Sequence, residues 1–415
     1  MRQSSVGSDR CAIVASHAIV MVLAGGQGQR LYPLTVRRAK PALRFGGAYR
    51  MIDFTLSNCL NSGLRRIYVL AQYAATSLMR HLRRGWTPLL SDALGEYIEV
   101  LPPQQVSSDR WYAGTADAVY QNLRLLQEER PEVVVLLSGD HAYKMDYRRM
   151  LEFHVEREAA LTIAALAVPV EKARQLGVMG IDEDGRVVDF AEKPAEPRTI
   201  PGRPDQALSN MGVYIWDTRT LAEWIARDAR QESEHDFGKN LLPAMVEARE
   251  AVYAYEFLDP RTGGPAYWRD IGTLQNYWES HMDLVRVVPE FDLYDPNWPI
   301  YTARDHYPPA KTVLGDRSQV VDSLLCEGCI VSGARVERSV LSPGVKVAEG
   351  AEVTESILFD RVEVGPGARL HRVIVDEGLR VPAGYQIGLS REEDERRFVV
   401  SPEGLTVVPQ GAVFH

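Results

Sequence analysis

The stretch that decides the fold covers residues 18–45 and reads AIVMVLAGGQGQRLYPLTVRRAKPALRF. Its first part is a short apolar run with the length and composition of a buried β-strand. Three glycines follow within a few residues, at Gly25, Gly26 and Gly28. Glycines directly after a strand let backbone N–H groups approach a phosphate closely. The stretch therefore predicts a phosphate-binding loop at a strand end, with a simple tight turn as the plain alternative.

The residues after the glycines distinguish this loop from two familiar phosphate-binding loops. A Walker loop needs Gly-Lys-Ser/Thr after its spacer, whereas the letters QRL follow Gly28. A dinucleotide fingerprint needs a helix that starts at the loop and an acidic residue near the end of the second strand. Here Pro33 and a basic run follow the glycines, and residues 66–72 (RIYVLAQ) carry no acid. Neither pattern fits.

A basic cluster follows the glycine loop and favours a functional interpretation. Arg30, Arg37, Arg38 and Lys40 all stand between residues 30 and 40. Arginine offers planar, bidentate hydrogen bonds to phosphate oxygens, and lysine offers a compact positive charge. Backbone N–H groups together with two or more cations can hold a triphosphate and stabilise a departing pyrophosphate. The basic cluster therefore favours a phosphate-binding loop over a solvated surface loop.

The composition is that of a globular protein. The chain has 415 residues, 45% of them hydrophobic and 25% charged, which is enough for two domains. A formal net charge of -9 with interspersed signs argues against a nucleic-acid binder. Four cysteines are too few for a disulfide framework. No segment reaches the roughly 18 apolar residues of a membrane span, so we expect a cytoplasmic protein that contacts neither membrane nor nucleic acid.

Up to about residue 285, short apolar runs alternate with longer helical patterns. Expected strands are residues 19–23, 67–71, 133–138 and 161–167, and expected helices are residues 54–61, 116–129 and 147–158. This alternation is typical of an α/β domain with a Rossmann-like, mostly parallel sheet. Ligands bind at the carboxyl ends of the strands in such sheets. We therefore expect the site at the glycine loop and at residues 138–141 (SGDH).

The last part of the chain holds an internal repeat. Residues 289–311 carry five prolines, so we expect a linker there, between a catalytic domain (1–288) and a second domain (312–415). The repeat anchors Ser323, Ser339, Ser356 and Arg372 are 16, 17 and 16 residues apart. Short strands with a turn every five or six residues favour a parallel β-helix over a β-sandwich, whose turns are more widely spaced. The lone CxxC at residues 326–329 is expected to fill coil positions, because a zinc site needs four ligands.

Two aspartates are candidate metal ligands. Asp140 stands two residues beyond the expected strand 133–138, and Asp270 lies in the segment YWRDIGT. Mg²⁺ takes few carboxylates and completes its shell with substrate phosphate oxygens and water. Each aspartate could equally be a turn former or a helix cap. The residues alone therefore leave both interpretations open.

Taken together, the motifs resemble a known family. The run GGQGQRLYPLTVRRAKP at residues 25–41 is similar to the signature of sugar-phosphate nucleotidyltransferases. Matching motifs continue in the same order, among them FGGAYRMIDFTLSNCLNSG (45–63), WYAGTADAVYQN (111–122), SGDHAYKMDY (138–147) and FAEKP (190–194). As a set they resemble bacterial ADP-glucose pyrophosphorylases (glucose-1-phosphate adenylyltransferases) over nearly the whole chain. The resemblance implies a GT-A-like nucleotidyltransferase domain followed by a left-handed parallel β-helix for oligomerisation and regulation.

The resemblance also implies a reaction and its residues. ATP and α-D-glucose 1-phosphate would give ADP-glucose and diphosphate with Mg²⁺, the first committed step of bacterial glycogen (α-glucan) synthesis. Implied catalytic residues are Arg30, Lys40, Asp140, Lys193 and Asp270, with Asp140 and Asp270 binding the metal. Implied ATP-binding residues are Leu23, Ala24, Gly25, Gly26, Gly28, Gln72, Gln104, Gln105, Gly114, Thr115 and Asp117. Implied residues for glucose 1-phosphate are Tyr112, Gly177, Glu192, Lys193 and Ser209.

Regulation is implied as well. The family is typically homotetrameric and allosteric, with phosphorylated or anionic metabolites as effectors. Arg37, Arg44 and Arg50 are the candidates for an anionic effector site. The chain departs from enterobacterial members at Ala48 and Glu128, where those proteins have Lys and Arg. Activation by fructose bisphosphate and inhibition by AMP are therefore not expected to carry over unchanged.

Two alternatives remain. One is a related sugar-1-phosphate nucleotidyltransferase that uses another nucleoside triphosphate or another sugar. The other is a non-catalytic regulatory paralogue, which we would expect to have lost metal-binding acids or basic residues. This chain keeps the full implied catalytic set, and that favours an enzyme.

Overall fold

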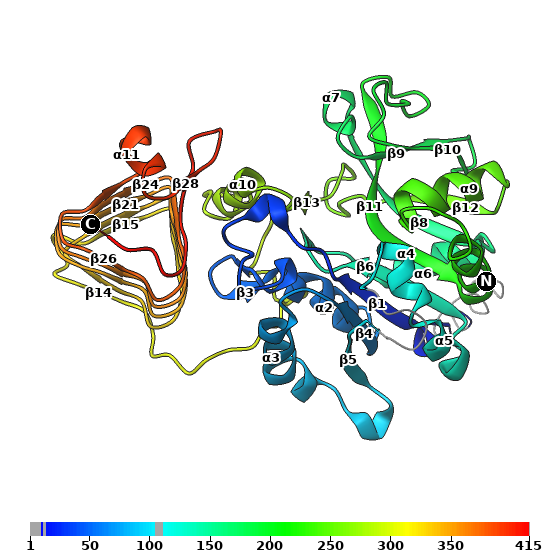
Figure 1. Cartoon of the computed structure of the whole chain (residues 1–415), viewed down its shortest axis with the longest axis horizontal. Helices are drawn as coiled ribbons and strands as arrows, with labels where there is room; N and C mark the ends of the chain where they lie inside the picture. Colours follow the sequence, from blue (N-terminus) through cyan, green and yellow to red (C-terminus); the bar gives the residue numbers. More distant parts are fainter. Residues whose placement is uncertain (1–9, 11–13, 104–110, 415) are drawn as a thin grey trace.

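The computed structural model describes residues 10, 14–103 and 111–414. Its first part is built on a nine-stranded sheet, and its last part is a β-helix (Figure 1). Along the sheet the strands run in the order β10-β9-β11-β6-β1-β4-β5, while β8 pairs with both β11 and β12. No helix in these described stretches is long and apolar enough to cross a membrane.

Four parallel strands carry the glycine loop. β1 (Ile19–Ala24) lies between β4 (Arg66–Ala71) and β6 (Val133–Ser138), and β5 (Tyr97–Leu101) pairs with β4. The strands predicted at 19–23, 67–71 and 133–138 are confirmed. Successive β1 residues face two different hydrophobic cores, one on each side of the sheet. A strand buried on both faces is apolar throughout, as the sequence of β1 is.

The other half of the sheet is mixed rather than parallel. β11 (Gln206–Asp217) runs antiparallel to β6, to β8 (Leu161–Pro169) and to β9 (Gly177–Ile181). β10 (Val187–Glu192) is antiparallel to β9, and β12 (Val252–Glu256) is parallel to β8. The predicted strand at 161–167 is therefore confirmed, but a mostly parallel sheet is not. Apolar runs predict strands without revealing which neighbour each strand will pair with.

Helices cover both faces of the sheet. They are α2 (Met51–Asn61), α3 (Ala75–Gly85), α4 (Thr115–Tyr120), α5 (Leu123–Glu129), α6 (Tyr147–Glu156), α7 (Val170–Ala173), α8 (Thr218–Asp228), α9 (Leu242–Glu247) and α10 (Leu274–Leu284). The helix predicted at 116–129 is two helices, α4 and α5. Asn122 stands between them, and its side-chain amide donates to the Ala118 carbonyl at 2.8 Å and to the Tyr112 hydroxyl at 3.2 Å. Short elements complete this part: β2 (Arg44–Phe45), β3 (Tyr49–Arg50), β7 (His141–Tyr143), β13 (Trp268–Asp270) and the single turns η1 (Gln29–Leu31), η2 (Lys40–Ala42), η3 (Thr87–Leu89), η4 (Asp92–Leu94) and η5 (Phe237–Leu241).

The predicted β-helix is confirmed. Its three parallel sheets stack one strand per coil: β14 (Lys311–Val313), β17 (Ile330–Ser332), β20 (Lys346–Val347), β23 (Glu363–Val364) and β26 (Arg380–Val381) in the first; β15 (Gln319–Val321), β18 (Arg335–Glu337), β21 (Glu352–Thr354), β24 (Arg369–His371) and β27 (Gln386–Ile387) in the second; β16 (Leu324–Leu325), β19 (Val340–Leu341), β22 (Ile357–Leu358), β25 (Val373–Val375) and β29 (Thr406–Val408) in the third. β28 (Val399–Val400) pairs with β29, and α11 (Arg391–Glu395) lies at the end of the last coil (Figure 1).

The serine anchors of the repeat form a hydrogen-bonded ladder. The Ser323 hydroxyl accepts from the Ser339 amide at 3.1 Å, and the Ser339 hydroxyl accepts from the Ser356 amide at 3.1 Å. The Ser356 hydroxyl continues the ladder to the Val373 amide at 3.2 Å. Each serine thus satisfies the backbone of the next coil, which explains why it recurs at this spacing.

The β-helix packs against the first part through a shared hydrophobic cluster. Phe45, Phe54 and Tyr277 lie in this cluster with Phe359 and Ile374 of the coils. The intervening residues 289–310 form no named helix or strand, and residues 298–301 contact α2. There the Trp298 indole donates to the side-chain oxygen Oδ1 of Asn58 at 2.9 Å. The coils are therefore held against the basic segment that follows the glycine loop.

Candidate active site

Three loops meet where the parallel strands end. The strand register pairs Leu23 of β1 with Ser138 of β6, and Ala24 with Ala71 of β4. The loops that follow these strands begin with Gly25, Gln72 and Gly139. Side chains distant in sequence therefore converge at one edge of the sheet, as expected for the carboxyl ends of parallel strands.

The glycine loop is shaped by two of its glycines. Gly28 has a φ of 63°, a left-handed conformation that glycine adopts without strain. A Cβ added there would lie 2.9 Å from Thr35 Cγ2, and the Thr35 hydroxyl donates to the Gly28 carbonyl at 2.9 Å. Gly26 has open space around its Cα and is exposed. The loop is thus fixed at Gly28 and leaves backbone accessible at Gly26.

Lys40 lies between the two predicted metal ligands. Its Nζ is 2.5 Å from Asp140 Oδ2 and 3.4 Å from Asp270 Oδ1. Asp140 follows β6, while Asp270 ends β13, which pairs with β7 so that Asp270 stands opposite His141. Arg30 is exposed, and its guanidinium would lie 3.2 Å from a Cβ added to Gly272. The four charged residues predicted for the triphosphate and metal are therefore together.

The charges in this cluster reinforce one another. Burial opposes the charge of Lys40, but Asp140 and Asp270 outweigh that effect and raise its pKa. Burial also opposes the charge of Asp140, yet Lys40 and then His141 hold the pKa of Asp140 well below its usual range. Lys40 and Asp140 therefore both carry full charge at neutral pH, as metal and phosphate chemistry requires.

The two carboxylates fit a divalent ion whose remaining ligands come from the phosphates of a substrate. Over the described part of the chain, no group of three or more His, Cys, Asp or Glu side chains could hold a metal ion. Asp140 and Asp270 keep 23% and 36% of their side-chain surface exposed. Mg²⁺ is commonly held by one or two carboxylates plus substrate phosphates. The donor set fits such an ion, with phosphate oxygens supplying further ligands.

The segment predicted to line the nucleotide is pinned by its own polar residues. Asp117 accepts from the Ala113 amide at 2.9 Å and from the Gln121 side chain at 2.9 Å. The Thr115 hydroxyl donates to Asp236 at 3.0 Å and accepts from the Phe237 amide at 3.0 Å. Thr115 and Asp117 therefore hold the shape of the loop with the hydrogen bonds seen here. Gln104 and Gln105 lie outside the described residues.

Tyr112 lies beside the glycine loop. Its ring would be 3.8 Å from a Cβ added to Gly25, and its amide donates to the Gln72 side chain at 2.6 Å. Sequence reasoning grouped Tyr112 with the sugar phosphate and Gln72 with ATP. The structure brings the two residues together next to Gly25.

Glu192, Lys193 and Gly177 form a second group at the ends of β9 and β10. Glu192 stands opposite Gly177 in the antiparallel register, and its Oε2 would be 2.8 Å from a Cβ on Gly177. Any side chain at Gly177 would displace this carboxylate. Lys193 Nζ is 3.6 Å from Glu192 Oε1 and stays 60% exposed. The ammonium is therefore free to pair with a ligand phosphate.

Sequence reasoning missed two polar residues near Glu192, Asn210 and Asp236. Ser209 was predicted to contact the sugar phosphate, but it is fully buried in β11 and its hydroxyl has no hydrogen-bond partner among the described residues. Its neighbour Asn210 is partly exposed, and its Cβ would be 3.5 Å from a Cβ on Gly177. Asn210 donates to the Tyr214 hydroxyl at 2.8 Å. A Cβ added to Gly238 would lie 3.4 Å from Asp236 Oδ1 and 3.3 Å from Glu192 Oε2. Strand alternation places Asn210 on the accessible face of β11, and the sugar-phosphate role of Ser209 stays a prediction.

Comparison with known proteins adds the family. The nucleotidyl transferase family model matches residues 19–286, and the model for the GlmU-like C-terminal hexapeptide matches residues 308–408. The chain is 49% identical to glucose-1-phosphate adenylyltransferase 2 of Alkalilimnicola ehrlichii, over 94% of this chain and 93% of that protein. It is 48% identical to the glucose-1-phosphate adenylyltransferases of Dechloromonas aromatica and Rhodopirellula baltica, over 94% and 95% of this chain and 90% of each relative.

The chain belongs to the glucose-1-phosphate adenylyltransferase family. Its architecture is accordingly a nucleotidyltransferase domain followed by a left-handed parallel β-helix. Nucleotidyltransferases of this kind generally use a divalent metal, in agreement with the donor set formed by Asp140 and Asp270.

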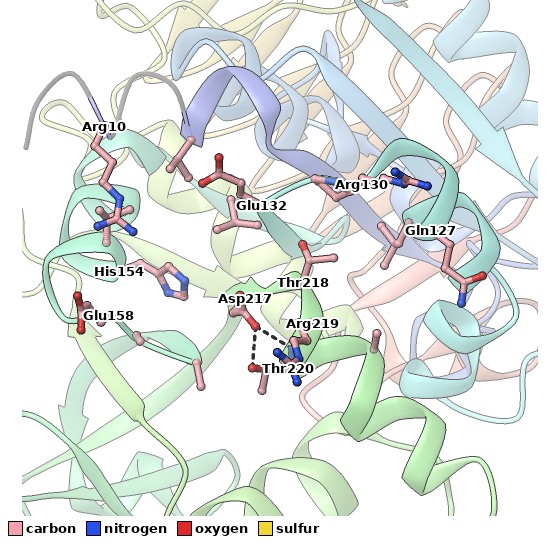
Figure 2. Close-up of a pocket in the computed structure, with 18 of the residues that line it drawn as sticks. Arg10, Gln127, Arg130, Glu132, His154, Glu158, Asp217, Thr218, Arg219 and Thr220 are labelled. Carbon is pink, nitrogen blue, oxygen red and sulfur yellow. Dashed lines mark hydrogen bonds between the residues drawn. The ribbon is translucent and has the colours of Figure 1, made fainter.

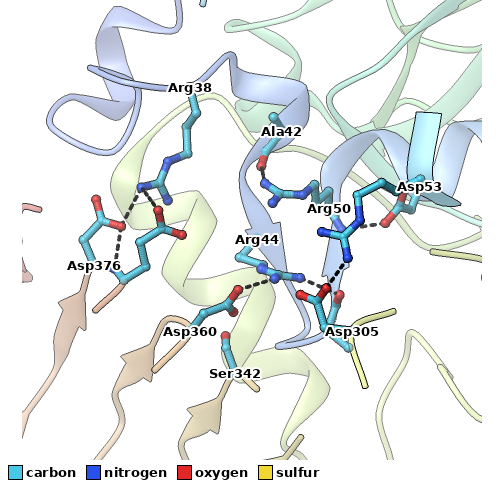
Figure 3. A network of polar contacts seen from close by, with 12 residues as sticks. Arg38, Ala42, Arg44, Arg50, Asp53, Asp305, Ser342, Asp360 and Asp376 are labelled. Carbon is cyan, nitrogen blue, oxygen red and sulfur yellow. Dashed lines mark hydrogen bonds and ion pairs between the residues drawn. The ribbon is translucent and has the colours of Figure 1, made fainter. Parts of the chain in front are cut away.

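Two of the predicted effector arginines, Arg44 and Arg50, lie with Arg38 at the contact with the β-helix (Figure 3), and the third, Arg37, donates to the Gln410 side chain at 3.3 Å. Arg38 is 2.7 Å from Asp376, and Arg44 pairs with Asp360. Arg50 donates to the Ala42 carbonyl, and burial followed by repulsion from Arg44 lowers its pKa to about 10. A cavity of about 260 Å³ is lined by Arg37, Arg38, Arg44, Arg50, Arg80, Arg84 and Arg361 together with Asp305, Asp360 and Glu377.

A larger cavity of about 730 Å³ lies at the opposite end of the strands of the nine-stranded sheet (Figure 2). Its lining includes Val133, where β6 begins, and Asp217, where β11 ends. The described lining contains none of the predicted substrate or metal residues. Volume alone therefore does not locate the active site of this protein, whereas the convergence of charged side chains does.

Proposed function

We propose that this chain transfers the adenylyl group of ATP to α-D-glucose 1-phosphate and forms ADP-glucose and diphosphate. The observation that carries the proposal is the convergence of Asp140 and Asp270 on Lys40, at the strand edge that also holds the glycine loop. The 45–49% identity to named glucose-1-phosphate adenylyltransferases supports the choice of substrates.

The proposed chemistry needs no covalent enzyme intermediate. The phosphate oxygen of the sugar phosphate is already an anion, so it attacks the α-phosphorus of ATP directly and in line. Pyrophosphate leaves from the opposite side, and catalysis rests on positioning and charge stabilisation. Arg30 and Lys40 neutralise the triphosphate, and the exposed ammonium of Lys193 orients the acceptor phosphate.

Mg²⁺ is the proposed metal, held by Asp140 and Asp270. Bound there, it would neutralise charge on the triphosphate oxygens. Lys40 has a complementary task, because its raised pKa keeps it protonated beside the two carboxylates. The lysine keeps the two aspartates close together and is within reach of an incoming phosphate.

Product formation over several substrates tests the proposal. Purified protein is incubated with glucose 1-phosphate, Mg²⁺ and ATP, UTP, dTTP or GTP, and both diphosphate and nucleotide sugar are measured. We expect ATP to give the highest kcat/KM and ADP-glucose as the product. A preference for another nucleotide would indicate a related pyrophosphorylase, and no turnover with any nucleotide or sugar phosphate would indicate a regulatory paralogue.

We further propose that the arginine-lined cavity binds an anionic metabolite and that β-helix carboxylates compete with it. Asp360 and Glu377 line the same cavity as Arg44 and Arg38, so an anion must displace or share their ion pairs. Burial raises the pKa of Asp360 despite Arg44 beside it. Desolvation of this carboxylate therefore makes it a replaceable partner.

A kinetic screen with a matched variant tests this regulation. Fructose 6-phosphate, fructose 1,6-bisphosphate, pyruvate, AMP and phosphate are titrated into the wild type and Asp360→Asn. We expect the variant to respond to its effector at roughly tenfold lower concentration, since a charge-assisted hydrogen bond is freed. Glu352→Gln, on an exposed coil face, should respond like the wild type. An unchanged response of Asp360→Asn would contradict the competition.

The homotetramer implied by the family resemblance also remains a proposal. Light scattering after size-exclusion chromatography measures the mass of the assembly directly. A mass of four chains supports the proposal, and a monomer or dimer contradicts it.

A further inference from the structure

The segment 233–238 touches both substrate-binding regions of the proposed active site. It connects α8 to η5, a single π-helical turn that spans Phe237–Leu241. Turns of this type are rare and are frequent at functional sites. The question is what this segment does between the two regions.

On one side the segment is hydrogen-bonded to residues 113–119, which are predicted to line the nucleotide and are called the nucleotide loop below. The Ala116 amide donates to the His235 carbonyl at 2.7 Å, and Thr115 bonds both Asp236 and the Phe237 amide. A Cβ added to Gly114 would lie 2.2 Å from the carbonyl oxygens of Glu234 and His235. Only glycine at 114 lets the two backbones approach this closely.

On the other side the segment contacts the sugar-phosphate group. A Cβ added to Gly238 would lie 3.3 Å from Glu192 Oε2. The Phe237 ring stacks on Tyr214 with centroids 6.0 Å apart, and Tyr214 accepts a hydrogen bond from Asn210. One short segment therefore reaches the glucose 1-phosphate residues and the nucleotide loop at the same time.

A side-chain pair anchors the segment from behind. His235 has a φ of 51°, a left-handed conformation that is strained for this residue. Its Nδ1 is 2.7 Å from Asp228 Oδ2, and Ser233 donates to Asp228 Oδ1 at 2.9 Å. Asp228 ends α8 and is only 7% exposed. The carboxylate thus fixes the residue whose carbonyl holds the nucleotide loop.

We propose that Asp228 and His235 are positioning residues that lock the nucleotide loop to the sugar-phosphate site and so set the alignment of the two substrates. This inference rests on the proposed function. Neither side chain touches a substrate in this account; the pair acts through the carbonyl of His235 and through Asp236. A merely structural pair would only relieve the strain of the left-handed residue.

Two substitutions of His235 separate these roles. His235→Ala removes the imidazole and keeps the strain, whereas His235→Gly removes both. We expect both variants to lose kcat by about 10- to 100-fold, because misplaced reactants lose that much rate. The affinity for ATP alone and for glucose 1-phosphate alone, measured by calorimetry, should stay near wild type. Asp228→Asn keeps an acceptor for the Nδ1–H and should lose less.

Recovery of wild-type kcat in His235→Gly would overturn the proposal. Glu158→Ala is the control, because Glu158 is also left-handed, with a φ of 47°, and lines the cavity at the opposite end of the strands. Its kcat should not change.

An inactive wild type would contradict the proposed function but not this inference. Amide hydrogen exchange of residues 113–119 then tests the positioning role. Exchange should be faster in His235→Gly than in the wild type and unchanged in Glu158→Ala. Unchanged exchange in His235→Gly would contradict the proposal.

Discussion

Arg38 and Lys40 are two residues apart, yet they enter ion-pair clusters of opposite character. Lys40 faces Asp140 and Asp270 of the sheet domain, whose side chains are 23% and 36% exposed. Arg38 faces Asp376 of the β-helix, and both side chains are nearly buried, at 7% and 4%. The first cluster is open to a ligand, and the second closes a contact between two parts of the chain.

The type of cation agrees with this difference. Lysine is a compact charge on a flexible stem, so it can move from carboxylates to phosphate. The Arg38 guanidinium is planar, bonds Asp376 and lies 5.7 Å from the centre of the Phe359 ring. Such a group is held from several sides. The comparison indicates exchangeable pairing of Lys40 at the proposed active site and persistent pairing of Arg38 with Asp376 at the β-helix contact, and the following experiments test it.

The largest expected effect is on turnover. Asp140→Asn should fold normally and lose kcat by about 100- to 1000-fold, the range seen when one stabiliser of transition-state charge is removed. Steady-state kinetics with ATP and glucose 1-phosphate measures it. Asp146→Asn, at the N-terminus of α6, is the control and should keep its activity. Near-full turnover in Asp140→Asn would remove the metal role from this residue.

The second effect is on stability. Asp376→Asn leaves the buried Arg38 without its close carboxylate, so the free energy of unfolding should fall by about 3 kcal/mol. Glu363→Gln breaks an exposed pair with Lys346, whose side chains are 36% and 58% exposed, and should cost less than about 1 kcal/mol. Chemical denaturation compares the two. Equal losses would show that the Arg38 contact is no more persistent than a surface pair.

A third effect concerns substrate binding. Lys193→Gln should raise the KM for glucose 1-phosphate roughly tenfold, because one charge-assisted contact to phosphate is lost, and should leave the KM for ATP nearly unchanged. Lys172→Gln, on the exposed surface of α7, serves as the control. A larger change for ATP than for glucose 1-phosphate would place Lys193 on the nucleotide side.

The last expected effect is a dependence of the free energy of unfolding on pH, which is small over each pH unit. Burial lowers the pKa of His281 and of His154 to about 4, while unfolded histidine titrates near its ordinary value. The unfolded chain therefore binds more protons between pH 6.5 and 4, so stability falls as the pH drops through this window. Each histidine contributes up to about 1.4 kcal/mol per pH unit. Denaturation curves at several pH values measure the slope, and His154→Gln should reduce it.

Much of the fold follows from local patterns. The apolar runs of β1, β4 and β6 and the serine repeat of the coils each predict one element, because burial on two faces or stacking on a neighbour requires those residues. The mixed half of the sheet was not predictable in this way. Strand direction there depends on pairing between β11 and segments far away in the chain.

The candidate site divides in the same manner. Arg30, Lys40, Asp140, Asp270 and Lys193 were predicted from motifs, and the first four lie together in the structure. Asn210 and Asp236 were not predicted, because an amide on a strand and an acid before a turn are unremarkable as sequence. Ser209 is buried in β11 beside the partly exposed Asn210, and its contact with the sugar phosphate stays a prediction.

The sequence by itself determined the strand that carries the glycine loop, the coils of the β-helix and the charged residues of the proposed chemistry. These features are encoded by residues close together in the chain, through backbone freedom, burial period and charge. Only the tertiary structure decided that Arg38 pairs with the β-helix while Lys40 pairs with the sheet, and that Asp228 and His235 stand behind the nucleotide loop. Such contacts join residues that are distant in sequence, and they exist only once the sheet and the coils have packed together.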